Sequence, residues 1–182
     1  VLSANREYRV WFLIISSFVF YGYWDIRLVP LLACSVGFNW ALVAAHRRWP
    51  QLPLILIAVA LNLALLGIFK YANFAADTIA WLTNFERQRW SIVLPLGISF
   101  FTFQQISYLV DTARGNAPKY SFNEYALYVC FFPQLIAGPI VRHNELVFQF
   151  ERDPRLGNVH ENLSRGAVLF LIGLVKKVFI AD

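Results

Sequence analysis

The chain has 182 residues, of which 58% are hydrophobic, 17% aromatic and only 15% charged, with a net charge of +5. A soluble domain of this size needs more polar surface, so the composition predicts a membrane protein with several spans. The basic residues are scattered between apolar runs, which argues against a nucleic-acid partner and favours membrane lipid. Cys34 and Cys130 lie in apolar runs without metal-ligand spacing, so neither a disulfide framework nor a metal site is expected.

Three apolar runs begin the chain, and we interpret them as successive membrane helices at residues 10–24, 28–45 and 52–69. Each run is close to, or a little short of, the roughly 20 residues that cross a bilayer. Arg6, Arg9, Arg47 and Arg48 flank the outer ends of the first two runs, whereas Arg27 alone lies between them. The positive-inside rule therefore predicts that the four flanking arginines lie in the cytoplasm. No cleavage site follows the first run, which we interpret as an anchor and not as a removable signal peptide.

The segments that follow are more polar. Residues 70–82 carry Asn73 and Asp77 among aromatic residues, which predicts a helix lying in the membrane interface. We then expect a loop at 83–91, a long helix at 92–111, a loop at 114–122, turns and short helices at 142–165, and another span from 166 to 180. Pro95 and Gly97 fall near the start of the long helix, where missing backbone hydrogen bonds cost least.

Residues 131–143, F-F-P-Q-L-I-A-G-P-I-V-R-H, form an apolar run that prolines interrupt and that ends on charge. Unpaired backbone groups are costly in hydrocarbon, so such a run is stable only where protein packs around it or where it lines a wet cavity. The sequence therefore predicts an all-α fold, a polytopic transmembrane helical bundle with a broken or re-entrant segment around 131–143 and short interfacial helices.

Polar residues form a stripe along the expected helix at 92–111. Gln104, Ser107, Tyr108 and Asp111 recur at the spacing of one helical face. Such a stripe in an apolar helix faces protein or water and not lipid. Hydrogen bonding between helices explains a stripe of this kind more often than substrate contact does, and both interpretations stay open. Asp111 is also placed to pair with Arg114, three residues further on.

The broken run holds the other polar candidates. Pro139 follows Gly138 and takes the chain out of the helix, so Arg142 either enters a cavity and binds an anion or extends to the head groups at the bilayer edge. We expect Gln134 to face the same cavity. His143 has no nucleophile or carboxylate at a recognisable spacing, and we interpret it as a loop residue and not as a catalytic base.

Three lysines, Lys70, Lys176 and Lys177, interrupt apolar runs near their ends. An ammonium group is costly in lipid, so each either marks the end of a span and extends to the interface or enters a pocket. The first interpretation is the one we favour.

Five stretches of the chain share a family pattern: F-K-Y-A-N-F at 69–74, L-P-L-G-I-S-F at 94–100, I-S-Y-L-V-D at 106–111, the run at 132–142, and K-K-V-F-I-A-D at 176–182. In content and order they resemble the membrane-bound O-acyltransferase family, most closely its alginate O-acetyltransferase branch. The resemblance implies a ring of helices around a thin core, with a funnel in which an acyl group passes to an extracytoplasmic hydroxyl. The residues that we expect to line this funnel or the donor path are Gln134, Pro139, Arg142, Gln104, Tyr108, Asp111, Lys70, Lys176 and Lys177.

The resemblance also implies that residues 1–182 are a partial single membrane domain, the N-terminal portion of the fold without its first helix and its C-terminal catalytic half. The family's catalytic histidine lies in a Trp-His-Gly-like segment, and no such segment occurs here. Neither His46, His143 nor His160 matches it. We therefore expect no catalytic residue in this chain and no activity from it alone. The absence of methionine also fits a fragment.

The function implied by the resemblance is transfer of an acyl group, expected to be acetyl, to an extracytoplasmic polysaccharide such as alginate. The donor would be a thioester such as acetyl-CoA or an acyl carrier thioester, with no bound cofactor. Membrane lipid, an extracytoplasmic acetyltransferase and the polysaccharide are the expected partners, in a bacterial inner membrane. Alternatives are D-alanyl transfer to teichoic acid, O-acetylation of peptidoglycan and, in another class, a transporter or flippase, which also needs broken helices.

Overall fold

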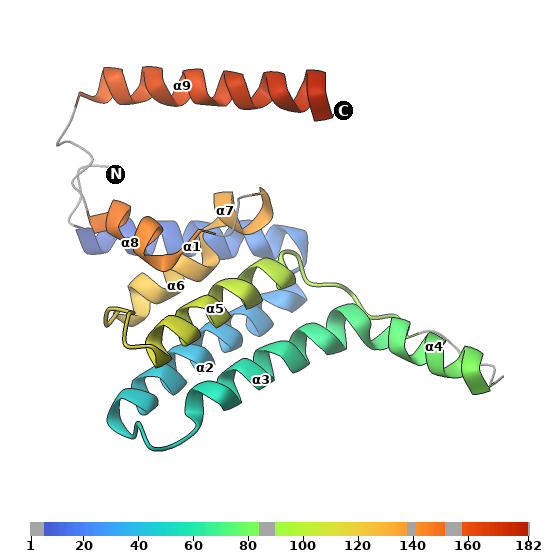
Figure 1. Cartoon of the computed structure of the whole chain (residues 1–182). Helices are drawn as coiled ribbons and strands as arrows, with labels where there is room; N and C mark the ends of the chain where they lie inside the picture. Colours follow the sequence, from blue (N-terminus) through green and yellow to red (C-terminus); the bar gives the residue numbers. More distant parts are fainter. Residues whose placement is uncertain (1–5, 84–89, 138–140, 152–157, 182) are drawn as a thin grey trace.

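The computed structural model describes residues 6–83, 90–137, 141–151 and 158–181 (Figure 1). These residues form helices and no strand, which confirms the predicted all-α class. The α-helices are α1 (Arg6–Trp24), α2 (Val29–Arg48), α3 (Leu54–Leu66), α4 (Ala72–Thr83), α5 (Ile98–Ala113), α6 (Phe122–Cys130), α7 (Phe132–Ala137), α8 (His143–Glu151) and α9 (Val159–Lys176). Shorter turns are the 3-10 turn η1 (Ile26–Leu28) and the π-helical turns η2 (Gly67–Tyr71) and η3 (Lys177–Ala181).

The first two helices form a hairpin joined by η1. Asp25 caps this turn, because its Oδ1 atom accepts a hydrogen bond of 2.9 Å from the backbone N–H of Arg27. Pro30 lies in the first turn of α2, where a missing N–H donor costs no helical hydrogen bond. The predicted spans at 10–24 and 28–45 fall within α1 and the η1–α2 helix.

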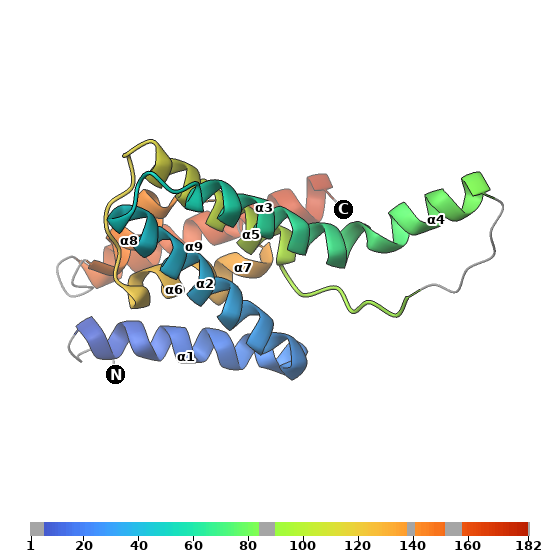
Figure 2. The same cartoon turned by 90° about the horizontal axis from the view of Figure 1, so that it is seen from below.

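A single continuous helix runs from Leu54 to Thr83, since η2 joins α3 to α4 without a break. The predicted helix at 70–82 is present as α4, but it continues α3 through η2, and Figures 1 and 2 show that the helix changes direction between α3 and α4. Its position in the membrane interface stays a prediction. At 1.5 Å per residue, the 30 residues of the continuous helix extend about 45 Å, more than the roughly 30 Å hydrocarbon core of a bilayer. Figures 1 and 2 show α4 projecting away from the other helices, and none of its residues is buried.

Two helices in the described part of the chain, Ile26–Arg48 and Leu54–Thr83, are long and apolar enough to cross a membrane. They contain the second and third of the predicted spans. Helix α1 is apolar over most of its 19 residues.

Helix α5 begins at Ile98, six residues later than the sequence predicts. Gly97 has a left-handed conformation, with φ of 67°, which ends any helix entering from residue 92. Asn73 of α4 holds the chain before Gly97 through two hydrogen bonds with the backbone of Trp90. The Nδ2 atom of Asn73 donates to the carbonyl of Trp90 at 2.9 Å, and its Oδ1 atom accepts from the N–H of Trp90 at 3.1 Å. An extended segment therefore returns from α4 to the bundle.

The core lies around α5 and α6. Helix α5 packs against α3, α2, α6 and α7, and α6 packs against α1, α2 and α8. Tyr125 to Cys130 are all buried, so this short helix is surrounded on every side. Its first turn is closed by a capping box between Ser121 and Glu124, and Glu124 also pairs with Arg6 of α1.

The last helices differ in their packing. Helix α8 lies against α6 and buries Leu146 and Val147, which confirms a short helix within 142–165. Helix α9 begins at Val159 and not at 166. Its described side chains are exposed, and Figure 1 shows it apart from the bundle. The predicted turns at 153–154 and 157–158 lie largely outside the described residues.

The left-handed Gly97 provides a test of how α5 and α7 pack. A Cβ atom at Gly97 would lie 2.7 Å from the carbonyl oxygen of Leu135, whereas one at Gly115, with φ of 73°, would meet nothing within 4 Å. Gly115→Ala should cost only the left-handed backbone penalty of about 1–2 kcal/mol. Gly97→Ala should cost clearly more, measured by thermal unfolding of the complete protein in detergent. Equal losses from the two substitutions would contradict this packing.

Candidate functional site

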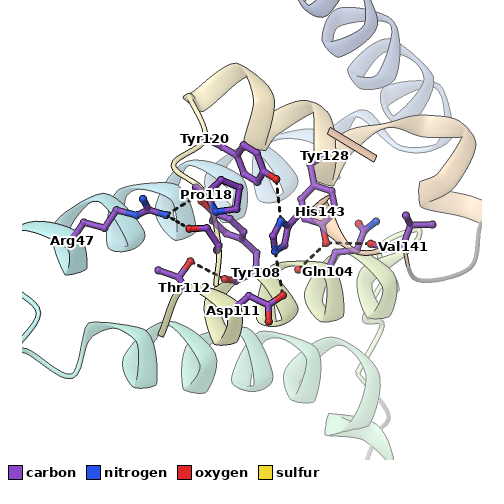
Figure 3. A network of polar contacts seen from close by, with 11 residues as sticks. Arg47, Gln104, Tyr108, Asp111, Thr112, Pro118, Tyr120, Tyr128, Val141 and His143 are labelled. Carbon is purple, nitrogen blue, oxygen red and sulfur yellow. Dashed lines mark hydrogen bonds and ion pairs between the residues drawn. The ribbon is translucent and has the colours of Figure 1, made fainter. Parts of the chain in front are cut away.

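A cluster of polar side chains lies where α5 ends and α8 begins (Figure 3). The Nε2 atom of His143 lies 3.2 Å from Oδ2 of Asp111, and its Nδ1 atom lies 3.0 Å from the hydroxyl of Tyr120. An ionised carboxylate only accepts, so Nε2 donates to Asp111; in the neutral imidazole Nδ1 then accepts from the Tyr120 hydroxyl. His143 is 2% exposed, and both of its ring nitrogens are therefore used within the protein.

This cluster corrects two interpretations of the sequence. His143 is not a loop residue without a carboxylate partner, because it begins α8 and contacts Asp111. Asp111, which the sequence places near Arg114, directs its carboxylate to a residue 32 positions away. A pair so far apart in the chain cannot be recognised from spacing.

Three tyrosine rings surround the His143 imidazole edge-on. Their centroids lie 5.2 Å away for Tyr108, 5.6 Å for Tyr120 and 6.3 Å for Tyr128. The Tyr128 hydroxyl reaches past the imidazole to the carbonyl of Val141, at 3.4 Å, and to a carbonyl of α5, at 3.3 Å. The rings exclude solvent from His143. The tyrosine hydroxyls form hydrogen bonds with His143 and with nearby backbone carbonyls.

Two side chains fasten the loop between α5 and α6 to the bundle. Nη2 of Arg47, at the end of α2, donates to the carbonyls of Ala117 and Pro118, at 3.2 and 2.9 Å. The Tyr108 hydroxyl donates to the same Pro118 carbonyl at 3.2 Å. Tyr108, one of the residues of the predicted stripe, thus bonds to the loop that follows its own helix.

A second polar cluster lies between α2, α3 and α5. Nδ2 of Asn39 donates to Oε1 of Gln105 at 2.8 Å, and Nδ2 of Asn62 donates to Oδ1 of Asn39 at 2.6 Å. Gln105 also donates to the hydroxyl of Ser35 at 3.0 Å and accepts from that of Tyr125 at 3.3 Å. The three amides are at most 3% exposed. They form a closed network that joins four helices.

The amide cluster was not predicted from the sequence. Asn39 and Asn62 each stand in an apolar helix, and that isolation was a usable signal, because a polar residue in a membrane helix faces protein. Gln105 lies beside Gln104 but outside the predicted stripe. Its partners are 66 and 70 residues away along the chain, so periodicity within one helix does not reveal them.

Two predicted glutamines are buried without all of their partners. Gln104 of α5 is 2% exposed, and its Oε1 atom has no hydrogen-bond partner among the described residues. Gln134 of α7 is 8% exposed, and neither its Oε1 nor its Nε2 atom has such a partner. Buried amide atoms are costly when unpaired. Both positions therefore require a further polar group, and Gln134 faces protein and not lipid.

The last residues of the broken run are described by the structure from Val141 onward. Pro139 lies outside the described residues. Arg142 is exposed, so the described chain does not enclose its guanidinium, and its role stays a prediction. The carbonyl of Arg142 accepts the N–H groups of Glu145 and Leu146, at 3.0 and 3.4 Å, and thereby starts α8.

The three lysines of the sequence analysis are exposed and do not enter a pocket of the described chain. Lys70 lies within the continuous helix Leu54–Thr83 and not at the end of that helix. Its Nζ atom donates to the hydroxyl of Ser99 at 3.3 Å. Lys176 and Lys177 stand at the junction of α9 and η3, and the helix continues beyond them to Ala181. A helix can continue beyond the membrane, so the expectation that these lysines mark the ends of spans stays a prediction. Their proposed contact with substrate is untested.

The described residues contain no group of three or more histidine, cysteine, aspartate or glutamate side chains that could hold a metal ion. The polar clusters can hold helices in register and present an exposed arginine beside them. An arrangement of this kind suits the wall of a membrane site.

Comparison with known proteins identifies relatives of this chain. It is 39% identical over 96% of its length to a peptidoglycan O-acetyltransferase of Helicobacter pylori, and 39% identical over its whole length to a probable alginate O-acetylase of Pseudomonas aeruginosa. A teichoic acid D-alanyltransferase of Lacticaseibacillus rhamnosus is 22% identical over 73% of the chain. The chain spans 38% and 36% of the lengths of the first two relatives. No protein-family model and no solved structure matches it.

The fold and its buried polar clusters define a helical membrane protein. Identities of 36–39% with alginate O-acetylases and a peptidoglycan O-acetyltransferase extend over nearly the whole chain. The chain belongs to the membrane-bound O-acyltransferase family, as its sequence motifs indicate.

The amide cluster should contribute measurably to stability. Asn39→Ala removes one amide from the network and leaves atoms of Asn62 and Gln105 buried with fewer partners, so we expect a loss of about 1–3 kcal/mol. The matched control is Asn144→Ala, the same change at an exposed position of α8. Thermal unfolding of the complete protein in detergent measures both. Similar midpoints for the two variants would show that the cluster does not hold the helices together.

Proposed function

We propose that this chain forms part of an integral membrane O-acyltransferase that transfers an acyl group, acetyl above all, to an extracytoplasmic polysaccharide. The observation that carries the proposal is the 36–39% identity with O-acetylating relatives over nearly the whole chain. The D-alanyltransferases are more distant, at 22% identity. Acetyl transfer is therefore favoured over D-alanyl transfer.

The equal identity to relatives named for different acceptors bears on what this part of the protein does. A peptidoglycan O-acetyltransferase and a probable alginate O-acetylase are both 39% identical to the chain. A segment that is equally similar to relatives named for different acceptors suits a step that does not depend on the acceptor. Handling of the acyl donor is such a step, and it is the step we assign to this chain.

Arg142 is the residue we assign to the donor. Its planar guanidinium is exposed at the end of the broken run and suits a phosphate or carboxylate. A phosphate-bearing thioester such as acetyl-CoA, or an acyl carrier thioester, has this chemistry. The acyl-transfer base would be supplied by the family's histidine, which this chain does not contain, and an extracytoplasmic acetyltransferase would act on the same polysaccharide.

The proposed location is the bacterial inner membrane, with Arg6, Arg47 and Arg48 in the cytoplasm. Contacts at one end of the bundle support this orientation. Arg6 pairs with Glu124 at the start of α6, and Arg47 binds the loop that leads into α6, so both lie at the same end. Arg27 follows α1 at its other end.

Acetylation in cells tests the proposed function. Deleting the complete reading frame should remove ester-linked acetyl from the cell-surface polysaccharide or peptidoglycan, measured by mass spectrometry of the purified glycan. In the restored gene, Arg142→Lys keeps the charge but loses two-point binding, so acetylation should fall about tenfold at limiting donor. The control is Arg165→Lys, at another exposed arginine that pairs with Glu161. An unchanged acetyl content after deletion would refute the function, and full activity of Arg142→Lys would refute the role of Arg142.

Cysteine accessibility tests the orientation. Single cysteines are introduced as Arg48→Cys and Arg27→Cys in a protein that also carries Cys34→Ser and Cys130→Ala. The outer membrane of the cells is permeabilised and the inner membrane is left sealed. A membrane-impermeant maleimide should then label position 27 and spare position 48, because the charge imbalance places residue 48 in the cytoplasm. Lysed cells should label both. Equal labelling of the two positions before lysis would overturn the topology.

A further inference from the structure

Residues Val141, Arg142 and His143 form the end of the broken run and are held from three directions. The carbonyl of Val141 accepts from the Tyr128 hydroxyl of α6 at 3.4 Å. The carbonyl of Arg142 accepts from two N–H groups of α8. The imidazole of His143 is bonded through both nitrogens, to α5 on one side and to the α5–α6 loop on the other. The backbone of this segment therefore has little freedom.

Helix α8 extends the same anchorage. His143, Leu146, Val147 and Phe150 follow the spacing of one helical face, and the first three are at most 9% exposed. Phe150 contacts Phe131 with ring centroids 5.1 Å apart, so both ends of the broken run meet on this face. The start of α8 is thus fixed by packing as well as by hydrogen bonds.

The Arg142 side chain stands out from this arrangement. Its neighbour His143 is buried and Val141 is half-buried, whereas Arg142 is exposed. An exposed guanidinium on a rigid base differs from an ordinary surface arginine, because an anion that binds it does not have to order the backbone first.

We propose that the Asp111–His143–Tyr120 triad and Tyr128 are positioning residues that fix the backbone at Arg142, so that its guanidinium is held ready for the anionic part of the acyl donor. The proposal rests on the proposed function for its effect on the reaction. A triad that only held α5 against α8 would lower stability when it is disrupted, without a specific effect on donor binding. A positioning triad acts through Arg142.

Spin labelling tests the positioning without any need for activity. A nitroxide is attached to the complete protein through Arg142→Cys, in the background with Cys34→Ser and Cys130→Ala, and its spectrum is recorded in native membranes. Asp111→Asn weakens the contact with His143 and should make the label clearly more mobile. Thr112→Val is the matched control, since Thr112 is a buried neighbour whose hydroxyl donates to the backbone carbonyl of Tyr108, and the change should leave the spectrum unchanged. Unaltered mobility in Asp111→Asn would overturn the proposal.

Kinetics with acetyl-CoA in inside-out membrane vesicles test the functional consequence. Asp111→Asn should raise KM for acetyl-CoA about tenfold and leave kcat within about twofold, as Arg142→Lys should. The double variant should show no further rise in KM, because both changes remove the same interaction. Tyr120→Phe, which keeps the ring, provides a milder variant if Asp111→Asn does not reach the membrane. It should raise KM in the same way.

The outcomes separate the two proposals. A fall in kcat with unchanged KM, or effects on KM that multiply in the double variant, would refute action through Arg142. Wild-type vesicles that transfer acetyl from no thioester to the glycan would refute the proposed function. The spin-label result would still decide whether the triad fixes residue 142.

Discussion

The fold depends on one constraint, that polar groups inside a membrane protein must find partners within the chain because the hydrocarbon offers none. Helix α5 carries four of the nine buried polar side chains of the described residues. On one side Gln105 accepts from Asn39 of α2, which in turn accepts from Asn62 of α3, and on the other side Asp111 contacts the imidazole of α8. Dispersion and helix geometry allow many ways to pack apolar helices, whereas these directional bonds fix the rotation of α5 about its own axis.

The constraint also explains where the described chain is incomplete. Gln104 and Gln134 are buried as deeply as the residues of the two clusters, yet three of their amide atoms have no partner among the described residues. They stand on α5 and α7, the two helices that meet at Gly97 and Leu135. This is the part of the bundle in which a further polar group, from water, ligand or protein, is required by energetics.

The sequence was most informative where a single physical rule decides the structure. Apolar runs located α1, α2 and α3, because burial in lipid depends on local composition alone. The rule failed at residue 92. A left-handed glycine, Gly97, ends a helix even within an apolar run. Of the candidate site, the stripe that includes Tyr108 and Asp111 was predictable from helical spacing. The partners His143, Asn39 and Asn62 were not, because contacts across 23 to 66 residues are set by packing.

The two ends of the bundle are built differently, and this difference follows from the same constraint. At the end marked by Arg6 and Arg47, charged and hydroxyl side chains bind loop carbonyls and helix starts at defined angles. At the other end, α4 and the segment after it carry exposed aromatic residues, such as Trp81 (78% exposed) and Trp90 (57% exposed). Asn73 joins the two segments by its hydrogen bonds with the backbone of Trp90. Directional bonds resist displacement, whereas aromatic surfaces slide at low cost. The first end, where the broken run leads into α8, therefore has a precise geometry. The second end is adaptable.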